Sequence, residues 1–141
     1  MFDVRGKRVI ITGGAQGLGK EFARRHLQEG CRVCISDVDV DKGGETVNLF
    51  QKQFGCAEDG LCFVKCDVSQ KEEWIALWDS AVKTLDGPID ILVNNAGLHP
   101  GVNQLLYIFN FLSSFLMERE SFKNDYNFTH STDGKRISPS T

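Results

Sequence analysis

A glycine-rich turn between a short apolar run and an amphipathic segment constrains the fold of this 141-residue chain most strongly. Residues 12–19 read Thr-Gly-Gly-Ala-Gln-Gly-Leu-Gly, and they follow Val-Ile-Ile at 9–11. Glycines let the backbone turn sharply and approach a ligand closely, because they carry no Cβ. The helix expected after them points unpaired N–H groups at the same place, which favours an anionic ligand. The turn therefore predicts a phosphate-binding site between a strand and a helix.

This turn is consistent with two kinds of nucleotide-binding site. It matches most of a P-loop, since four residues separate Gly14 from Gly19 and Lys20 follows. A P-loop then needs a Ser or Thr to bind Mg²⁺, whereas this chain has Glu21, whose charge would repel phosphates. A dinucleotide site instead predicts an acidic residue about 20 positions beyond the glycines, and Asp37 stands there. Its carboxylate would accept hydrogen bonds from the ribose hydroxyls and would repel a 2′-phosphate, which favours NAD over NADP.

Apolar patterns along the chain predict alternating strands and helices. We expect strands at 8–12, 31–36, 61–66 and 89–94, and helices at 17–29, 41–54 and 70–85. Strands joined through helices by short connections form a parallel sheet with right-handed crossovers. The expected fold is an α/β, Rossmann-type doubly wound sheet, incomplete at four strands, in the order 3-2-1-4. In this order the glycine turn, Asp37, Asp67 and Asn94 meet at the carboxyl ends of the strands, where such sheets bind ligands.

Composition and charge narrow the possible partners. A formal charge of −3 argues against nucleic acid, which requires a basic surface. The first residues mix charges and lack the apolar stretch of a signal peptide, so we expect a cytoplasmic protein. The apolar stretch at 105–117 is too short to span a membrane, so we expect a helix that is buried or binds a partner.

A metal site is not expected from the five cysteines and three histidines. On a strand, Cys31 and Cys34 would lie on opposite faces. Cys62 and Cys66 would share a face but lie about 13 Å apart at ~3.3 Å per residue. The cysteines are therefore interpreted as small core residues, as is usual in a reducing compartment.

Three motifs in this order resemble the short-chain dehydrogenase/reductase family: Thr12-Gly13-x-x-x-Gly17-x-Gly19, Asp67-Val68 and Asn94-Asn95-Ala96-Gly97. The resemblance implies NAD-dependent oxidation of a secondary alcohol. It also implies that Asp37 binds the adenosine ribose, that Asp67 and Val68 hold the adenine edge, and that 94–97 lie beside the cofactor. The cofactor-binding residues expected from the motifs are Gly13, Gln16, Gly17, Leu18, Gly19, Asp37, Val38, Cys66, Asp67, Val68, Asn94, Ala96 and Gly97.

The catalytic residues of the family cannot be placed on this sequence. The family uses a serine and a Tyr-x-x-x-Lys pair, but the two tyrosines, Tyr107 and Tyr126, are followed four residues later by Phe111 and His130. No catalytic residue is therefore assigned. The motifs end at about residue 97, so we expect an NAD-binding half-domain at 1–97. A divergent tail would follow at 98–141, with an apolar helix at about 103–118 and then disordered residues.

Two functional interpretations stay open. In the first, the chain carries only the cofactor-binding half of an NAD-dependent alcohol dehydrogenase. In the second, it is a catalytically inactive truncated isoform that binds NAD, a second copy of itself or a full-length relative through the apolar helix. The sequence does not specify the substrate or the oligomeric state.

Overall fold

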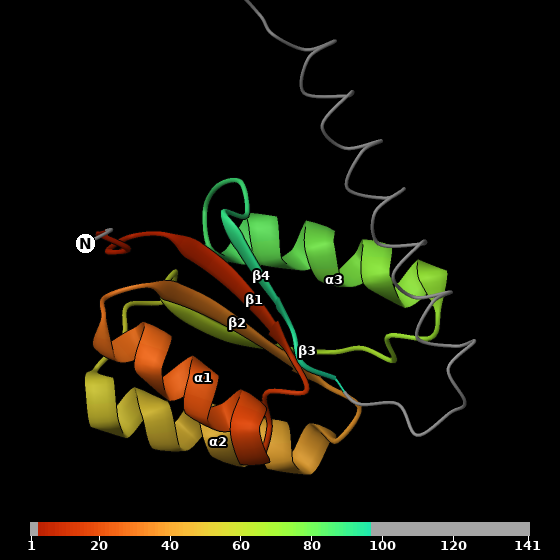
Figure 1. The fold of residues 1–141 in the computed structure, drawn as a ribbon, viewed down its shortest axis with the longest axis horizontal. Helices are drawn as coiled ribbons and strands as arrows, with labels where there is room; N and C mark the ends of the chain where they lie inside the picture. Colours follow the sequence, from red (N-terminus) through yellow and green to blue (C-terminus); the bar gives the residue numbers. More distant parts are fainter. Residues whose placement is uncertain (1–2, 97–141) are drawn as a thin grey trace, which may run out of the picture. The chain divides into compact units, whose positions relative to one another are not determined.

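A computed structural model describes residues 3–96, which form one parallel sheet covered by helices on both faces (Figure 1). The predicted alternation of strands and helices is confirmed. The elements are β1 (Arg8–Thr12), α1 (Gly17–Gln28), β2 (Arg32–Asp37), α2 (Val40–Phe54), β3 (Leu61–Lys65), α3 (Lys71–Thr84) and β4 (Ile91–Asn94). The sheet order is β3-β2-β1-β4, as predicted, and all three strand pairings are parallel. Within the described residues β3 and β4 are the two edges.

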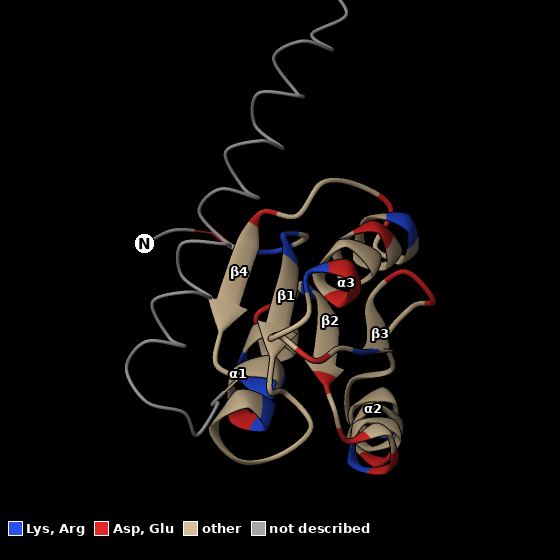
Figure 2. Cartoon of the chain, turned by 90° about the vertical axis from the view of Figure 1, so that its right-hand side faces the viewer, with Lys and Arg blue, Asp and Glu red and all other residues tan. Residues whose placement is uncertain are grey.

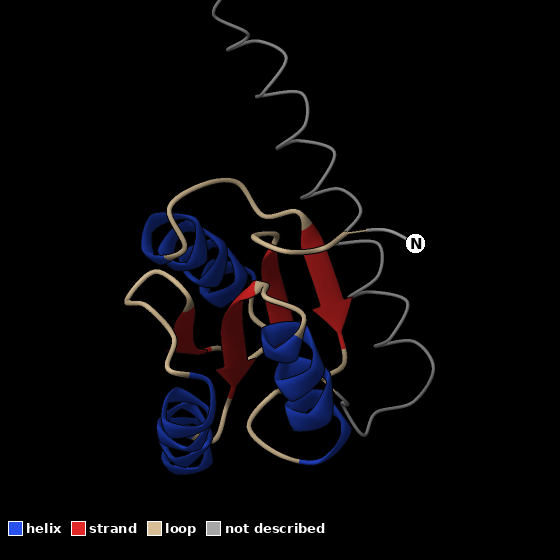
Figure 3. Ribbon diagram, turned by 90° about the vertical axis from the view of Figure 1, so that its left-hand side faces the viewer, coloured by secondary structure: helices blue, strands red, loops and turns tan. Residues whose placement is uncertain are grey.

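The sheet separates two helical layers. In Figures 1 and 3, α1 and α2 cover one face and α3 covers the other. Successive residues of a strand point to opposite faces, and both faces are covered here, so the middle residues of the inner strands, 9–11 in β1 and 33–35 in β2, are all apolar. Charged residues accordingly gather on the helices and loops in Figure 2.

One hydrophobic core lies between the sheet and the first two helices. Its buried members come from β1, from β2 and the residue before it, from β3 and from one face each of α1 and α2: Val9, Ile11, Ala23, Leu27, Cys31, Val33, Ile35, Phe50 and Leu61. On the opposite face α3 buries Trp74, Leu77 and Ala81, which recur at helical spacing. The indole Nε1 of Trp74 donates to the carbonyl oxygen of Val68 at 2.8 Å. This bond fixes the loop that leaves the carboxyl end of β3.

Element ends differ from the prediction by one or two residues. Helix α2 begins at Val40 because Asp39 is its N-cap, with a carboxylate that accepts from the N–H of Lys42 at 3.0 Å. Strand β4 begins at Ile91 instead of residue 89. The residue before it, Asp90, instead accepts a hydrogen bond on Oδ2 from the backbone N–H of Arg8 at 2.9 Å. Such side-chain bonds at element ends are not visible in apolar periodicity.

Several predictions fall on residues that are not described. The expected apolar helix at about 103–118, the disordered tail and Gly97 all lie outside residues 3–96, and so they stay predictions. None of the helices found within 3–96 combines the length and the apolar character needed to cross a membrane.

Candidate functional site

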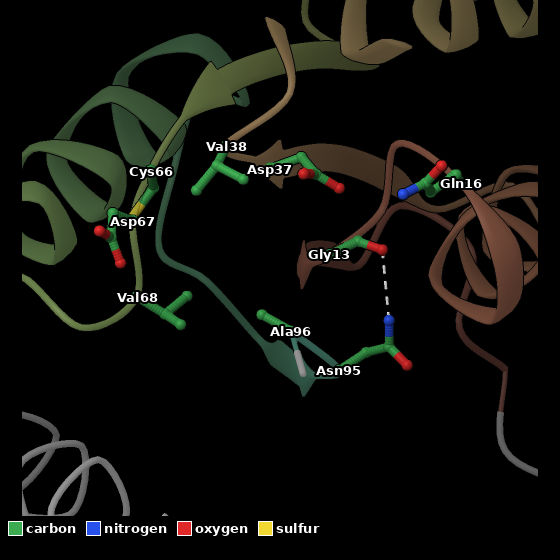
Figure 4. Close-up of a pocket in the computed structure, with 9 residues that line it drawn as sticks. All are labelled: Gly13, Gln16, Asp37, Val38, Cys66, Asp67, Val68, Asn95 and Ala96. Atoms are coloured by element: carbon green, nitrogen blue, oxygen red, sulfur yellow. Dashed lines mark hydrogen bonds between the residues drawn. The ribbon is translucent and has the colours of Figure 1, made fainter. Parts of the chain in front are cut away.

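A pocket of about 290 Å³ opens where the strands end (Figure 4). It is lined by Gly13, Gln16, Asp37, Val38, Cys66, Asp67, Val68, Asn95 and Ala96. Eight of these nine residues belong to the set expected from the sequence, and Asn95 is the ninth. They lie at or just after the carboxyl ends of β1, β2, β3 and β4, so the parallel sheet brings four distant segments together at one edge.

The glycine turn is packed so tightly that three of its glycines have no room for a side chain. A Cβ built on Gly14 would lie 2.7 Å from the Cγ2 of the buried Ile35. Gly13 has φ of +65°, and a Cβ built on it would lie 2.9 Å from the Cα of Ala96. A Cβ on Gly19 would overlap the carbonyl oxygen of Gly13. Gly17 has φ of +59° but open space around it, so there only the backbone conformation requires glycine. The motif thus shapes the pocket wall at positions 13 and 19 and the entry to α1 at 17.

Asp37 joins the end of β2 to the glycine turn. Its Oδ2 accepts from the backbone N–H of Ala15 at 3.1 Å, and its Oδ1 accepts from the N–H of Asp39 at 3.1 Å. An ionised carboxylate has about four lone-pair sites, so both oxygens can still accept from a ligand. Figure 4 shows this carboxylate at the pocket, between Val38 and Gly13.

Thr12 links the ends of β1 and β4 beneath the pocket. Its side chain is fully buried, and its Oγ1 accepts from the backbone N–H groups of Asn95 and Ala96, each at 3.1 Å. The amide Nδ2 of Asn95 in turn donates to the carbonyl oxygen of Gly13 at 3.2 Å (Figure 4). Thr12 and Asn95 belong to the sequence motifs, but the motifs alone do not predict that these two residues hold the site together. Only their position at the ends of neighbouring strands reveals that role.

The wall formed after β3 is acidic and partly apolar. The Oδ1 of Asp67 accepts from the Oγ of Ser69 at 2.7 Å and from its backbone N–H at 2.9 Å, and these two bonds lower the pKa of Asp67. Burial, and next the negative charge of Glu73, raise the pKa of the Cys66 thiol to about 11. No lysine or arginine is among the nine lining residues. The pocket therefore offers hydrogen-bond acceptors and apolar surface to a ligand.

Four of the expected cofactor residues within 3–96 do not line this pocket, and the fifth, Gly97, lies outside the described residues. Gly17 and Leu18 begin α1, and the Leu18 side chain is 64 % exposed. Gly19 packs behind Gly13, while Asn94 lies on β4 with its Oδ1 3.3 Å from the Oγ1 of Thr12. Contact of these five with a cofactor stays a prediction. No cluster of side chains suited to a metal ion occurs within residues 3–96.

The sheet order, the glycine turn after β1 and the acidic residue ending β2 define a Rossmann-type α/β domain. Comparison with protein families agrees with this class. The model of the family described as short chain dehydrogenase matches residues 7–116, past the position at which the quoted motifs end. The chain belongs to this family.

Two characterised relatives and one solved structure illustrate the similarity. The chain is 41% identical over 92 residues to 7alpha-hydroxysteroid dehydrogenase of Escherichia coli, covering 65% of this chain and 34% of the relative. It is 37% identical over 98 residues to 15-hydroxyprostaglandin dehydrogenase [NAD(+)] of Bos taurus, covering 68% and 35%. A short chain dehydrogenase/reductase from Burkholderia phymatum in complex with NAD superposes with a TM-score of 0.64 at 28% identity, covering 77% and 40%.

The segments at 15–17, 37, 66–68 and 90–97 are similar to NAD-dependent 15-hydroxyprostaglandin dehydrogenase, and the bovine relative confirms this resemblance. The chain spans about a third of the length of the curated relatives it matches.

Proposed function

We propose that this chain binds NAD, with the adenosine part of the cofactor in the pocket at the strand ends. The observation that carries the proposal is the position of the Asp37 carboxylate, which bonds to the glycine turn at Ala15 and also faces the pocket. A ribose lying there would donate its hydroxyl hydrogens to Asp37. The pyrophosphate would then reach the turn that precedes α1, where free N–H groups and the helix dipole favour negative charge.

The residues present fit this part of the cofactor. A volume of about 290 Å³ is at the lower end of ligand pockets, which measure roughly 300–1,000 Å³, so it suits the adenosine part better than a whole dinucleotide. Val38 and Val68 supply apolar surface for the flat faces of an adenine, and Asp67 would lie at the edge of the adenine ring. The missing Cβ atoms of Gly13 and Gly19 leave the backbone open to close approach.

Discrimination against NADP follows from charge. A 2′-phosphate on the ribose would lie against the Asp37 carboxylate, and the lining residues include no cation that would neutralise it. Like charges at such short range disfavour binding. The chain should therefore prefer NAD.

The reaction that we propose for the family activity is oxidation of a secondary alcohol, as in 15-hydroxyprostaglandin dehydrogenase, in which NAD accepts a hydride. Support comes from the names of two relatives, which act on a hydroxysteroid and a hydroxyprostaglandin. This chain would supply the cofactor-binding half. Hydride transfer also needs a group that takes the hydroxyl proton. The nine lining residues include no tyrosine, lysine or histidine.

A second candidate function is that of a catalytically inactive, truncated isoform that binds NAD or pairs with a copy of itself or a full-length relative. Neither tyrosine in the 141 residues is followed by a lysine four positions later. Within residues 3–96, β4 is also an edge strand whose three apolar residues are only partly buried. Such an edge can associate with another chain.

Calorimetric titration with NAD and NADP tests the proposed cofactor. Binding of NAD at a lower Kd than NADP supports it, and the absence of NAD binding would contradict it. NADH absorbance with a panel of secondary alcohols, including hydroxy fatty acids, then separates the two candidates. Turnover that follows the purified chain would exclude the inactive isoform, whereas NAD binding with background rates alone would favour it.

A further inference from the structure

Gln16 lies at the rim of the pocket, and its side chain is not used to cap a helix. It is the N-cap residue of α1, yet its side chain makes no capping hydrogen bond to that helix. It lines the pocket beside Gly13 and Asp37. Figure 4 shows the amide nitrogen of Gln16 on the side facing these two residues and the amide oxygen turned away from them.

Lys42 accounts for this orientation of the Gln16 amide. Its Nζ donates to the Oε1 of Gln16 at 2.5 Å, from a position 26 residues further along the chain, in the first turn of α2. An ammonium group has three donors and no acceptor, so it can bond only to the oxygen of an amide. The oxygen is therefore held toward α2, and the NH₂ group is left facing the pocket.

Thr46 holds the backbone next to Gln16 from the same helix. Its side chain is buried, and its Oγ1 donates to the carbonyl oxygen of Ala15 at 2.7 Å. Lys42 and Thr46 are four residues apart, so they lie on the same face of α2. This face contacts two consecutive residues of the glycine turn, one through its carbonyl group and the other through its side chain.

We propose that Lys42 and Thr46 are positioning residues, which hold Gln16 so that its amide NH₂ group donates to a ribose or phosphate oxygen of the adenosine half of NAD. The inference rests on the proposed function for its ligand, while the contact between Lys42 and Gln16 is independent of it. The role of Lys42 is exerted through Gln16 and not through a contact with the cofactor. The pocket thereby gains a donor opposite the acceptors of Asp37.

Nuclear magnetic resonance on the 141-residue chain without ligand tests the contact itself. The side-chain NH₂ signals of Gln16 are assigned by their loss in Gln16→Ala. Lys42→Met should shift these signals, and Lys42→Arg should keep them close to the wild-type position because arginine also donates. Lys52→Met is the matched control, since Lys52 is an exposed lysine in the last turn of the same helix. Gln16 NH₂ signals that keep their wild-type positions in Lys42→Met would overturn the contact between Lys42 and Gln16.

A double-mutant cycle measured by NAD calorimetry tests the role. Lys42→Met should raise the Kd about two- to fivefold, as loss of a modest hydrogen-bond contribution predicts, and Lys42→Arg should restore it. In a Gln16→Ala background, Lys42→Met should add no further loss. An equal loss in both backgrounds would mean that Lys42 acts on the cofactor directly, and would overturn the positioning role.

Thr46 is tested by a pair of variants that differ in the hydroxyl group. Thr46→Val should weaken NAD binding and Thr46→Ser should retain it, because serine keeps the donor to Ala15. A Thr46→Val protein with wild-type affinity would overturn the role of Thr46. If the wild-type chain does not bind NAD, the proposed function is contradicted. If the wild-type chain binds NAD and the Kd does not depend on Lys42, only the positioning role is contradicted.

Discussion

Asp37 and Ala15 are joined by a hydrogen bond of 3.1 Å from the backbone N–H of Ala15 to the carboxylate Oδ2 of Asp37, across 22 residues of sequence. The bond fixes the glycine turn to the end of the neighbouring strand. The same carboxylate faces the pocket, so one side chain both shapes the turn and offers acceptors to a ligand. Replacement of Asp37 should therefore affect cofactor affinity and cofactor choice together.

Thr12 is expected to maintain the pocket wall from below. Thr12→Val keeps the shape but removes the oxygen that accepts from the N–H groups of Asn95 and Ala96. Buried donors left without a partner cost about 1–3 kcal/mol, so the free energy of unfolding should fall by about that amount and NAD affinity should fall with it. Urea unfolding and calorimetry measure the two effects. Thr12→Ser is the control that keeps the oxygen, and a Thr12→Val protein equal to it in both would contradict this role.

The close packing at Gly19 predicts a strong effect of one added methyl group. Gly19→Ala places a Cβ against the carbonyl oxygen of Gly13, so the turn must move and NAD affinity should fall at least about tenfold, or ~1.4 kcal/mol. Gly44→Ala is the matched control, because nothing lies within 4 Å of a Cβ at that position in α2. Alanine there should raise the free energy of unfolding by about 0.4–1 kcal/mol. Equal NAD affinities of the two variants would contradict the packing argument.

Alkylation of Cys66 should be slow and dependent on pH. Burial and the charge of Glu73 raise its pKa to about 11, so little of the reactive thiolate is present at pH 8 and the rate should climb as the pH approaches 11. Cys62 should react sooner, because a hydrogen bond from Cys34 lowers its pKa and it is less buried. Mass spectrometry after timed iodoacetamide treatment measures both. NAD should slow the reaction of Cys66, which lines the pocket, and faster reaction of Cys66 than Cys62 at pH 8 would contradict this order.

The sequence predicted what local pattern and chain connectivity control. The apolar run at 9–11 and the glycine turn gave β1 and the start of α1, and short connections gave the strand order. Because parallel strands end at one edge, this order also brought most of the pocket residues together.

Side-chain contacts between elements were not predictable from the sequence, because they depend on the register of the strands and on the packing of the helices. The sequence spacing relates Cys34 to Cys31, whereas the structural neighbour of Cys34 is Cys62, its register partner on β3. The bonds of Lys42 and Thr46 to the glycine turn also depend on how α2 packs beside it, which sequence spacing does not encode.

Calorimetry of Asp37→Ala with NAD and NADP is the most direct test of whether Asp37 binds the ribose of NAD. A charge-assisted hydrogen bond contributes about 1.5–3 kcal/mol, so NAD affinity should fall roughly 10- to 150-fold while the preference over NADP narrows. Asp41→Ala, at an exposed position in the first turn of α2, is the control and should retain the wild-type preference. Wild-type chain that binds NAD and NADP equally, or Asp37→Ala protein that keeps both the affinity and the preference of the wild type, would contradict the account.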